Sequence, residues 1–383
     1  MRKVNTVQIA IVGGGIGGLT AAIALQQRGF SVRVYEAAAS WQPVGKGIWL
    51  PTNALRALDR LGLSVPLMSC GWALAKIEIL DCRDGLLQQV DLRLIAERLG
   101  YTTLSIRRAD LHHVLCDHLL PETCQLDHRC TGFTQDEQRV TMHFADGSET
   151  VADLLIGADG LHSIIRQTLF PGIAVRYSGQ TCLRGIASFT LPPPLAHTCQ
   201  EWWDGEHRFG FSAIDERHVY WFAPLLAPAG GNETLATLQL AKRYATFPQP
   251  VPTLLQHTPP AEIILTDLYE LPPLPSWWQR RVVLLGDAAH AMMPNLGQGG
   301  AQAIEDAIVL ADCLSKLPLF ETLHAYEQTR RPRVERIARA ARLFSQIAHI
   351  RSGYLQWLRN RIVRLMPAWL SQRQLNWLYQ FRE

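Results

Sequence analysis

No arrangement of cysteines in this sequence indicates a disulfide framework or a zinc site. The eight cysteines form no C-x-x-C pair and follow no regular spacing along the 383 residues. Free thiols persist in reducing compartments, and a chain of this length can bury a core without disulfide or metal staples. We therefore predict a cytoplasmic protein with no metal site.

The sequence also lacks a strong charge imbalance. Lysine and arginine together exceed the acidic residues by only three, and basic residues are spread along the chain until roughly the last fifty positions. A protein that binds nucleic acid usually concentrates its basic residues in a patch, so we expect no nucleic-acid partner.

Two basic residues near the start precede an uncharged span from Val4 to Gln27, which has the length of a signal peptide or a single membrane pass. Six glycines fall between Gly13 and Gly29, however. They favour a strand, a tight turn and a packed helix over a segment that faces lipid.

The apolar run at residues 7–12 predicts a buried strand, and a glycine-rich turn at 13–18 leads into a helical pattern. In such a unit Gly13 bends the chain, Gly15 admits a pyrophosphate against the backbone, and Gly18 packs the helix on the strand. Because a helix N-terminus favours negative charge, the turn is a candidate dinucleotide site that comprises Gly13, Gly15, Ile16 and Gly18.

The next apolar run, SVRVYE, predicts a second strand that ends at Glu36. A carboxylate at this distance from the glycine turn can accept hydrogen bonds from both hydroxyls of an adenosine ribose. The alternative is a solvated residue at a strand end.

Another combination of a strand and a glycine-rich loop occupies residues 282–307. The aliphatic run at 282–285 predicts a buried parallel strand, and Asp287 follows it, where its carboxylate can accept hydrogen bonds from ligand hydroxyls. Proline and glycine then interrupt regular structure before a helix that we expect to begin after Gly300. Its N-terminus could face an anionic ring or phosphate. The candidate residues of this loop are Pro294, Gly297, Gly299 and Gly300; the alternative is a loop that binds nothing.

Shorter signals lie between these two stretches. Gly45 and Gly47 predict a loop before a helix near Asn53, and residues 81–99 predict an inserted strand pair with a short helix. Arg108 would open a further helix, where it could bind a diphosphate or belong to an exposed basic pair.

Asp159 follows another predicted strand, after a hairpin with Asp-Gly at its turn. Ser163 and Arg166 come next at helical spacing. Arg166 could anchor Asp159 or reach a phosphate, or these residues could only cap and brace the helix.

Three motifs in fixed order, over roughly residues 7–345, resemble those of the single-component flavoprotein monooxygenases. They are G-x-G-x-x-G with Glu36, D-G-x-x-S-x-x-R at 159–166, and G-D-x-x-H-x-x-x-P at 286–294. The loop sequence GQGGAQAIEDA looks closest to the branch of alkylquinolone hydroxylases, urate hydroxylases and zeaxanthin epoxidases.

The resemblance implies a non-covalent FAD whose ring system lies near residues 297–300. It implies that NADH or NADPH reduces the FAD, that dioxygen forms a flavin 4a-hydroperoxide, and that one oxygen atom enters a small, mostly apolar aromatic or heteroaromatic ring. Three other functions stay open: an isoprenoid or olefin epoxidase, a flavin-dependent reductase of double bonds, and a flavin-binding sensor without catalysis. The residues implied in FAD binding are Gly13, Gly15, Gly18, Glu36, Gly47, Arg108, Asp159 and Asp287.

The expected fold is α/β, with a Rossmann-like FAD-binding domain, an inserted antiparallel sheet that binds substrate, and C-terminal helices. The first part of the FAD-binding domain is predicted at residues 1–176 and the second at 276–335. Residues 177–275 would form the substrate sheet, and 336–383 a helical tail.

The strands of the predicted substrate sheet are rich in aromatic residues. Alternation places Arg208, Ser212, Tyr220 and Phe222 on one face, which we expect to look toward the flavin. We name Arg208 and Tyr220 as catalytic candidates. A buried Arg208 needs a charge partner, which could be a substrate oxygen or a protein carboxylate.

The tail carries many arginines together with Trp357, Trp369 and Trp377. It could make weak contact with a membrane surface, or pack on the flavin domain with its basic side chains in water. We expect a monomer or a homodimer.

Overall fold

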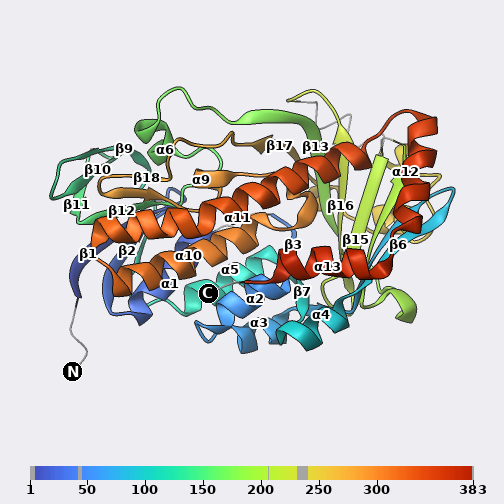
Figure 1. Cartoon of the computed structure of the whole chain (residues 1–383), viewed down its shortest axis with the longest axis horizontal. Helices are drawn as coiled ribbons and strands as arrows, with labels where there is room; N and C mark the ends of the chain where they lie inside the picture. The colour runs from blue at the N-terminus through green and yellow to red at the C-terminus, as the bar shows by residue number, and fades with distance from the viewer. Residues whose placement is uncertain (1–4, 42–44, 206, 231–239, 382–383) are drawn as a thin grey trace.

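The computed structural model describes residues 5–41, 45–205, 207–230 and 240–381. Two large sheets stand at opposite ends of the molecule, and the long helix α11 (Leu319–Ala348) runs from one toward the other (Figure 1). None of the described helices combines the length and the apolar character that a membrane-spanning segment needs.

The first sheet has the Rossmann-like character expected from the sequence. Its neighbouring strands β19, β12, β1, β2 and β8 all pair in parallel, and β18 adds an antiparallel edge. In sheet order the strands are β18 (Trp278–Gln279), β19 (Val282–Leu284), β12 (Leu154–Gly157), β1 (Asn5–Val12), β2 (Phe30–Tyr35) and β8 (Cys124–Gln125).

Helices cover this sheet and form the larger core. α1 buries almost its whole circumference, because small and aliphatic side chains such as Ala21 and Ile23 lie between the sheet and α10. Each fully buried aliphatic side chain contributes about 1.5–3 kcal/mol. The helices of this part are α1 (Ile16–Gln27), α2 (Thr52–Asp59), α3 (Ser64–Cys70), α5 (Arg108–Asp117), α6 (Ile164–Leu169), α9 (Asp287–His290) and α10 (Gly299–Lys316).

Two small sheets border the first one. The predicted hairpin is present as β10 and β11, with β9 beside β10. The strands of the two small sheets are β9 (Cys130–Gln135), β10 (Val140–Phe144) and β11 (Glu149–Ala152), and β3 (Gly47–Leu50), β7 (Thr103–Arg107) and β4 (Trp72–Leu74).

The second large sheet contains the predicted antiparallel substrate strands. Its order is β17 (Ile264–Glu270), β13 (Arg176–Ser188), β16 (His218–Leu226), β15 (His207–Ala213), β14 (Thr198–Asp204), β5 (Lys76–Asp81) and β6 (Gly85–Asp91). Short helices accompany it, namely α4 (Leu92–Leu99), α8 (Val251–Gln256), and the 3-10 turns η1 (Pro193–Leu195) and η2 (Pro260–Glu262).

The element boundaries differ from the predicted segments in two places. β5 and β6 belong to residues 1–176, yet they complete the substrate sheet because the backbone of β5 pairs in parallel with β14. α11 continues without interruption past residue 335, and the helices α12 (Gly353–Leu365) and α13 (Ala368–Tyr379) follow it.

Candidate active site

The glycine turn after β1 contains two glycines that packing requires and one glycine that leaves space for a ligand. A Cβ atom at Gly13 would lie 2.4 Å from the Ala158 carbonyl oxygen, and one at Gly18 would lie 2.0 Å from the Gly13 carbonyl oxygen. Both glycines are therefore required for packing. At Gly15 a Cβ would meet no atom within 4 Å, and this residue is exposed at the N-terminus of α1. The open space fits a ligand phosphate held by the helix end.

A cavity of about 390 Å³ lies beside this turn, within the ~300–1,000 Å³ typical of ligand pockets. Glu36 borders it, and its carboxylate accepts hydrogen bonds from the backbone N–H groups of Gly14 at 2.7 Å and Ala38 at 2.9 Å. Two of the three predicted acidic residues, Glu36 and Asp159, thus reach the same cavity. His128, Arg129 and His162 also line it. His128 and Arg129 belong to no motif, and His162 stands at a variable position of the motif at 159–166, so the sequence did not reveal them.

Asp159 has a second role as part of a helix cap. Its carboxylate accepts hydrogen bonds from the Ser163 hydroxyl at 2.5 Å and the Ile165 N–H at 3.2 Å. Burial raises the pKa of Asp159. Arg166 instead donates to the carbonyl oxygens of Leu161 at 2.7 Å and Ala288 at 3.2 Å. Arg166 therefore braces α6 against α9, which was one of the alternatives the sequence left open.

Arg108 and Asp287 form another part of the site, at the first positions of two helices. Arg108 is the first residue of α5, as the sequence predicted. Asp287 follows β19, also as predicted, and in addition opens the short helix α9, which was not predicted. Both side chains are exposed to solvent. Protein nevertheless surrounds Arg108 closely enough that burial lowers its pKa, while the charge of Asp287 opposes this effect. A charged pair of this kind at an opening can bind the polar groups of a cofactor.

The loop after α9 leads directly into α10. Pro294 begins the 3-10 turn η3 (Pro294–Leu296), and Gly297 has a positive φ of 62°. α10 begins at Gly299, earlier than expected, because the first-turn N–H groups need no intrahelical partner and glycine is tolerated there. A Cβ at Gly299 would lie 3.9 Å from Asp287 Oδ1, so this helix end and Asp287 are adjacent.

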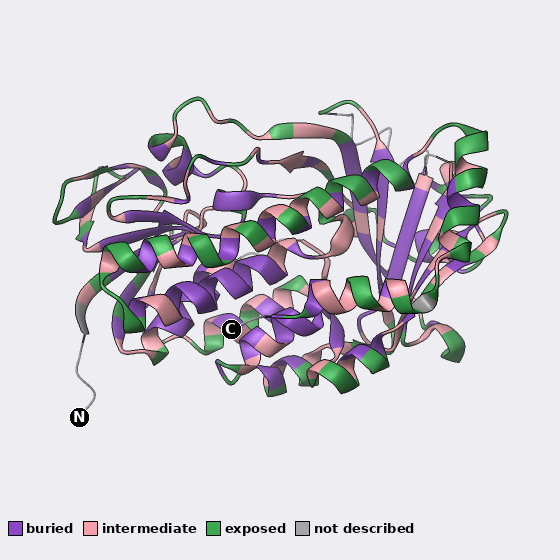
Figure 2. Cartoon of the chain, in the orientation of Figure 1, coloured by how far each residue is buried: buried purple, intermediate pink, exposed green. Residues whose placement is uncertain are grey.

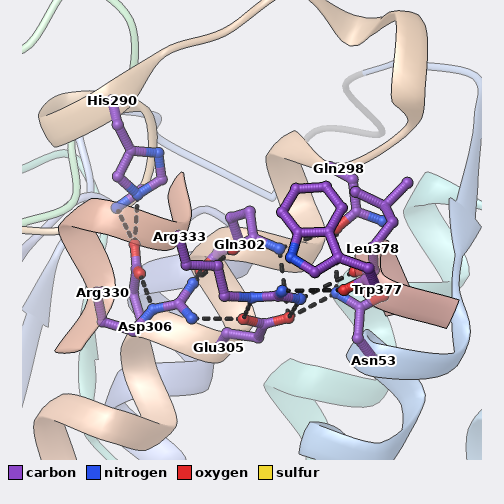
Figure 3. Close-up of polar contacts among 11 residues, drawn as sticks. Asn53, His290, Gln298, Gln302, Glu305, Asp306, Arg330, Arg333, Trp377 and Leu378 are labelled. Atoms are coloured by element: carbon purple, nitrogen blue, oxygen red, sulfur yellow. Dashed lines mark hydrogen bonds and ion pairs between the residues drawn. The ribbon is translucent and has the colours of Figure 1, made fainter. Parts of the chain in front are cut away.

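A buried ionic network fixes α10 behind this loop (Figure 3). Arg330 from α11 pairs with Glu305 and, at 2.7 Å, with Asp306. Asp306 Oδ2 also lies 2.5 Å from His290 Nε2 of α9. Burial alone would raise the pKa of each carboxyl group, but the cationic partners lower it. The signal in the sequence is the acidic pair Glu305-Asp306 inside an otherwise apolar helical pattern, which by itself does not identify the cationic partners.

The strand alternation predicted for the substrate sheet is present. Phe209, Phe211 and Trp221 pack into a separate core on one side, while Ser212 pairs with Tyr220 across β15 and β16 on the other. Ser212 Oγ accepts a hydrogen bond from Trp49 Nε1 at 3.1 Å, so this face contacts β3 of the first domain.

Aromatic side chains dominate this face near the first domain. The Tyr220 ring lies against Gly47, where a Cβ would be only 2.3 Å from the ring, and Phe222 meets Trp49 edge to face at 5.8 Å. Gly47 is therefore needed for Tyr220 to pack. Burial raises the pKa of Tyr220 to about 12, although the nearby positive charges of Arg184 and Arg108 oppose this effect. Tyr220 consequently remains a neutral phenol at physiological pH.

Arg208 does not need a substrate as its charge partner. Its side chain is 1% exposed, its Nε donates to Glu201 Oε1 at 2.7 Å, and its Nη1 donates to Asn295 Oδ1 at 2.8 Å. Of the two alternatives for Arg208, a substrate oxygen or a protein carboxylate, the second is present: Glu201 on the neighbouring strand β14 is its charge partner. Arg208 connects the substrate sheet with η3, and we no longer treat it as a catalytic candidate.

Arg184 on β13 is a site residue that the sequence analysis missed. Its positive charge lies close enough to Tyr220 to oppose the rise that burial causes in the pKa of that phenol. No carboxylate among the described residues lies within ion-pair distance of Arg184, in contrast to Arg208. Its strand, TCLRGIA, had shown no motif, and only the register against β16 places Arg184 beside Tyr220 and Phe222.

These features define a dinucleotide-binding enzyme with a second sheet beside the cofactor loop. Residues 6–341 match the family model described as FAD binding domain, so the chain belongs to this family. The chain is 35% identical to an aurachin C monooxygenase/isomerase from Stigmatella aurantiaca, with 94% of each chain covered.

Two further relatives agree with this assignment. A 2-heptyl-3-hydroxy-4(1H)-quinolone synthase from Pseudomonas aeruginosa is 33% identical, with 96% of each chain covered. The structure of Klebsiella pneumoniae HpxO in complex with FAD and uric acid superposes with a TM-score of 0.90 at 27% identity, covering 99% of this chain and 98% of that one. The protein is therefore an FAD-dependent monooxygenase of the single-component class, as the resemblance of its motifs implied.

Proposed function

We propose that the protein oxidises NADH or NADPH and inserts one atom of dioxygen into a nitrogen-containing heteroaromatic ring, with a quinolone-like ring as the favoured substrate. The observation that carries this proposal is the position of the Arg184 cation next to the neutral phenol of Tyr220, beside Phe222 and Trp49. Within the described part of the chain, no carboxylate forms an ion pair with Arg184. A carbonyl or phenolate oxygen attached to the substrate ring can bind Arg184 and Tyr220, while the ring itself packs on the aromatic side chains. The names of relatives that act on a quinolone and on urate support this substrate class.

The protein's own residues bind and orient both partners of the reaction. Gly15, Glu36, Arg108 and Asp287 would hold FAD, and the positive end of α10 would favour negative charge on the part of FAD beside it. Bound FAD supplies the electron transfer and the oxygen activation, which side chains alone do not provide.

A screen of heteroaromatic compounds for accelerated NADH or NADPH oxidation tests the proposal, followed by turnover under labelled dioxygen. We expect a quinolone to stimulate oxidation and the label to appear in the product. Label from water alone would contradict oxygen insertion, and turnover of an alkene without oxygen uptake would favour the reductase. An epoxide product would favour the epoxidase. If no compound stimulated turnover, the sensor would be favoured.

A matched pair of variants tests the role of Arg184. Arg184→Met should raise the substrate KM at least about tenfold while FAD content stays unchanged, since a charge-assisted hydrogen bond is lost. Arg176→Met, at an exposed position at the start of the same strand, should leave the substrate KM unchanged. A KM that does not respond to Arg184→Met would contradict substrate binding by this residue.

A further inference from the structure

Helix α12 presents most of its apolar side chains to solvent, whereas two of its polar side chains, Arg359 and Asn360, are buried against the protein. Tyr354 is 69% exposed, Ile362 57% and Leu365 77%, whereas Arg359 is 5% exposed and Asn360 4%. Figure 2 shows the outer side of α12, at the right-hand edge of the molecule, as largely exposed. This orientation is the reverse of that in an ordinary surface helix.

Specific bonds hold α12 in this orientation. The Arg359 guanidinium lies 3.6 Å from Asp81 and stacks 4.7 Å from the centre of the Trp203 ring. Asn360 Nδ2 donates to Asp84 Oδ2 at 2.7 Å. Rotating the helix to bury its apolar side would break these contacts and leave Asp81 without its arginine, so the outward apolar face is stable.

The outward face combines aromatic, aliphatic and basic side chains. Arg361 lies over the Trp357 ring at 5.3 Å, and Leu355 and Leu358 are also exposed. Between residues 336 and 381 the sequence has eight arginines and neither lysine nor an acidic residue. Tryptophan and tyrosine beside arginine are typical of segments that lie in the headgroup region of a bilayer.

We propose that the outward face of α12 is a docking surface for a membrane that contains anionic lipid. The apolar side chains would enter the boundary between headgroups and acyl chains, and the arginines would attract the lipid phosphates. A symmetric contact between two copies would instead bring two arginine-rich edges together, with no acidic side chain from residues 336–381 to neutralise them.

Sedimentation of the FAD-loaded protein with lipid vesicles tests this proposal. Wild-type protein should bind vesicles of phosphatidylcholine with phosphatidylglycerol, and binding should weaken as salt rises. Ile362→Glu/Leu365→Glu should reduce the partition coefficient at least about tenfold with FAD content unchanged. Val65→Glu, at a 75% exposed position on α3, is the matched control and should bind as the wild type does.

Three outcomes would overturn the proposal. The first is failure of the wild-type protein to bind anionic vesicles, and the second is equal binding by the double variant and the control. The third, measured by analytical ultracentrifugation without lipid, is a wild-type dimer that Ile362→Glu/Leu365→Glu converts to a monomer, because a second copy would then cover α12.

Discussion

At the scale of single residues, a buried ion pair lies next to η3 and has a histidine nearby. Arg208 and Glu201 form a buried ion pair, and Trp203 Nε1 donates to the same carboxylate at 2.6 Å. His349 lies close enough to Arg208 to feel its charge. Substitutions of these groups should therefore change the stability of the protein measurably.

Replacing Arg208 by methionine should lower the free energy of unfolding by about 3 kcal/mol, because it leaves the Glu201 carboxylate buried without its cation. Chemical denaturation measures this loss. The double variant Arg208→Met/Glu201→Met should lose less than the sum of the two single variants, since it removes both charges. If Arg208→Met were as stable as the wild type and raised only the substrate KM, Arg208 would bind substrate after all.

The stability of the protein should fall in mildly acidic solution because of His349. Burial, and then the positive charge of Arg208, lowers the pKa of His349 to about 4 from 6.5. Unfolding therefore takes up a proton below pH 6.5, and this costs about 2 kcal/mol of stability by pH 5. His349→Gln should lack this part of the decrease when denaturation is compared at pH 7 and pH 5. An equal decrease in both proteins would contradict the low pKa.

At the scale of elements, the turn between β1 and α1 contains glycines with two different roles. Gly18 lies where helix and turn meet, and Gly15 lies where the helix end meets open space. The same motif thus serves folding at one position and the ligand at another.

Gly15→Val should give a folded protein that no longer binds FAD, because the added side chain occupies the space for the phosphates. Gly18→Val should fail to fold, or lose several kcal/mol, because its Cβ collides with backbone. Flavin absorbance after desalting and circular dichroism separate the two effects. Full FAD occupancy in folded Gly15→Val would refute the phosphate site.

At the scale of the whole molecule, the predicted FAD contacts come from segments that are far apart in the chain, from Gly13 to Gly300. Bound FAD would therefore stabilise the arrangement of the α1, α5 and α10 elements together. A ligand at one hundred times its Kd adds about 2.7 kcal/mol to the stability of the folded state.

Adding FAD to the apoprotein at this excess should raise the Tm by about 3 °C, given the unfolding entropy expected for 383 residues. Differential scanning calorimetry measures the shift. The apoprotein of Gly15→Val is the control and should show none. An equal shift in both proteins would mean that FAD binds elsewhere.

The location in the cytoplasm and the use of NADH or NADPH remain predictions from sequence. Activity with each nucleotide, and fractionation of cells for the protein, would test them directly. The membrane contact proposed for α12 is compatible with a protein that partitions between both fractions.

The cofactor motifs could be predicted from the sequence by itself, because each depends on residues that are close together in the chain. The turn at 13–18 and the loop at 294–300 have backbone requirements that glycine and proline reveal directly. The strand end at Glu36 is indicated by the apolar run before it and by its distance from the turn. The alternation along β15 and β16 was also predictable, since side chains of a strand point to opposite faces in turn.

Only the tertiary structure decided which distant side chains meet. The pairing of Arg208 with Glu201 depends on the register of β14 against β15, and the position of Arg184 beside Tyr220 depends on that of β13 against β16. The addition of β5 to the substrate sheet and the outward apolar face of α12 have the same origin. Arg208 and Glu201 are only seven residues apart, but the other contacts join residues with a long separation along the chain. In both cases local composition carries no information about strand register or helix orientation.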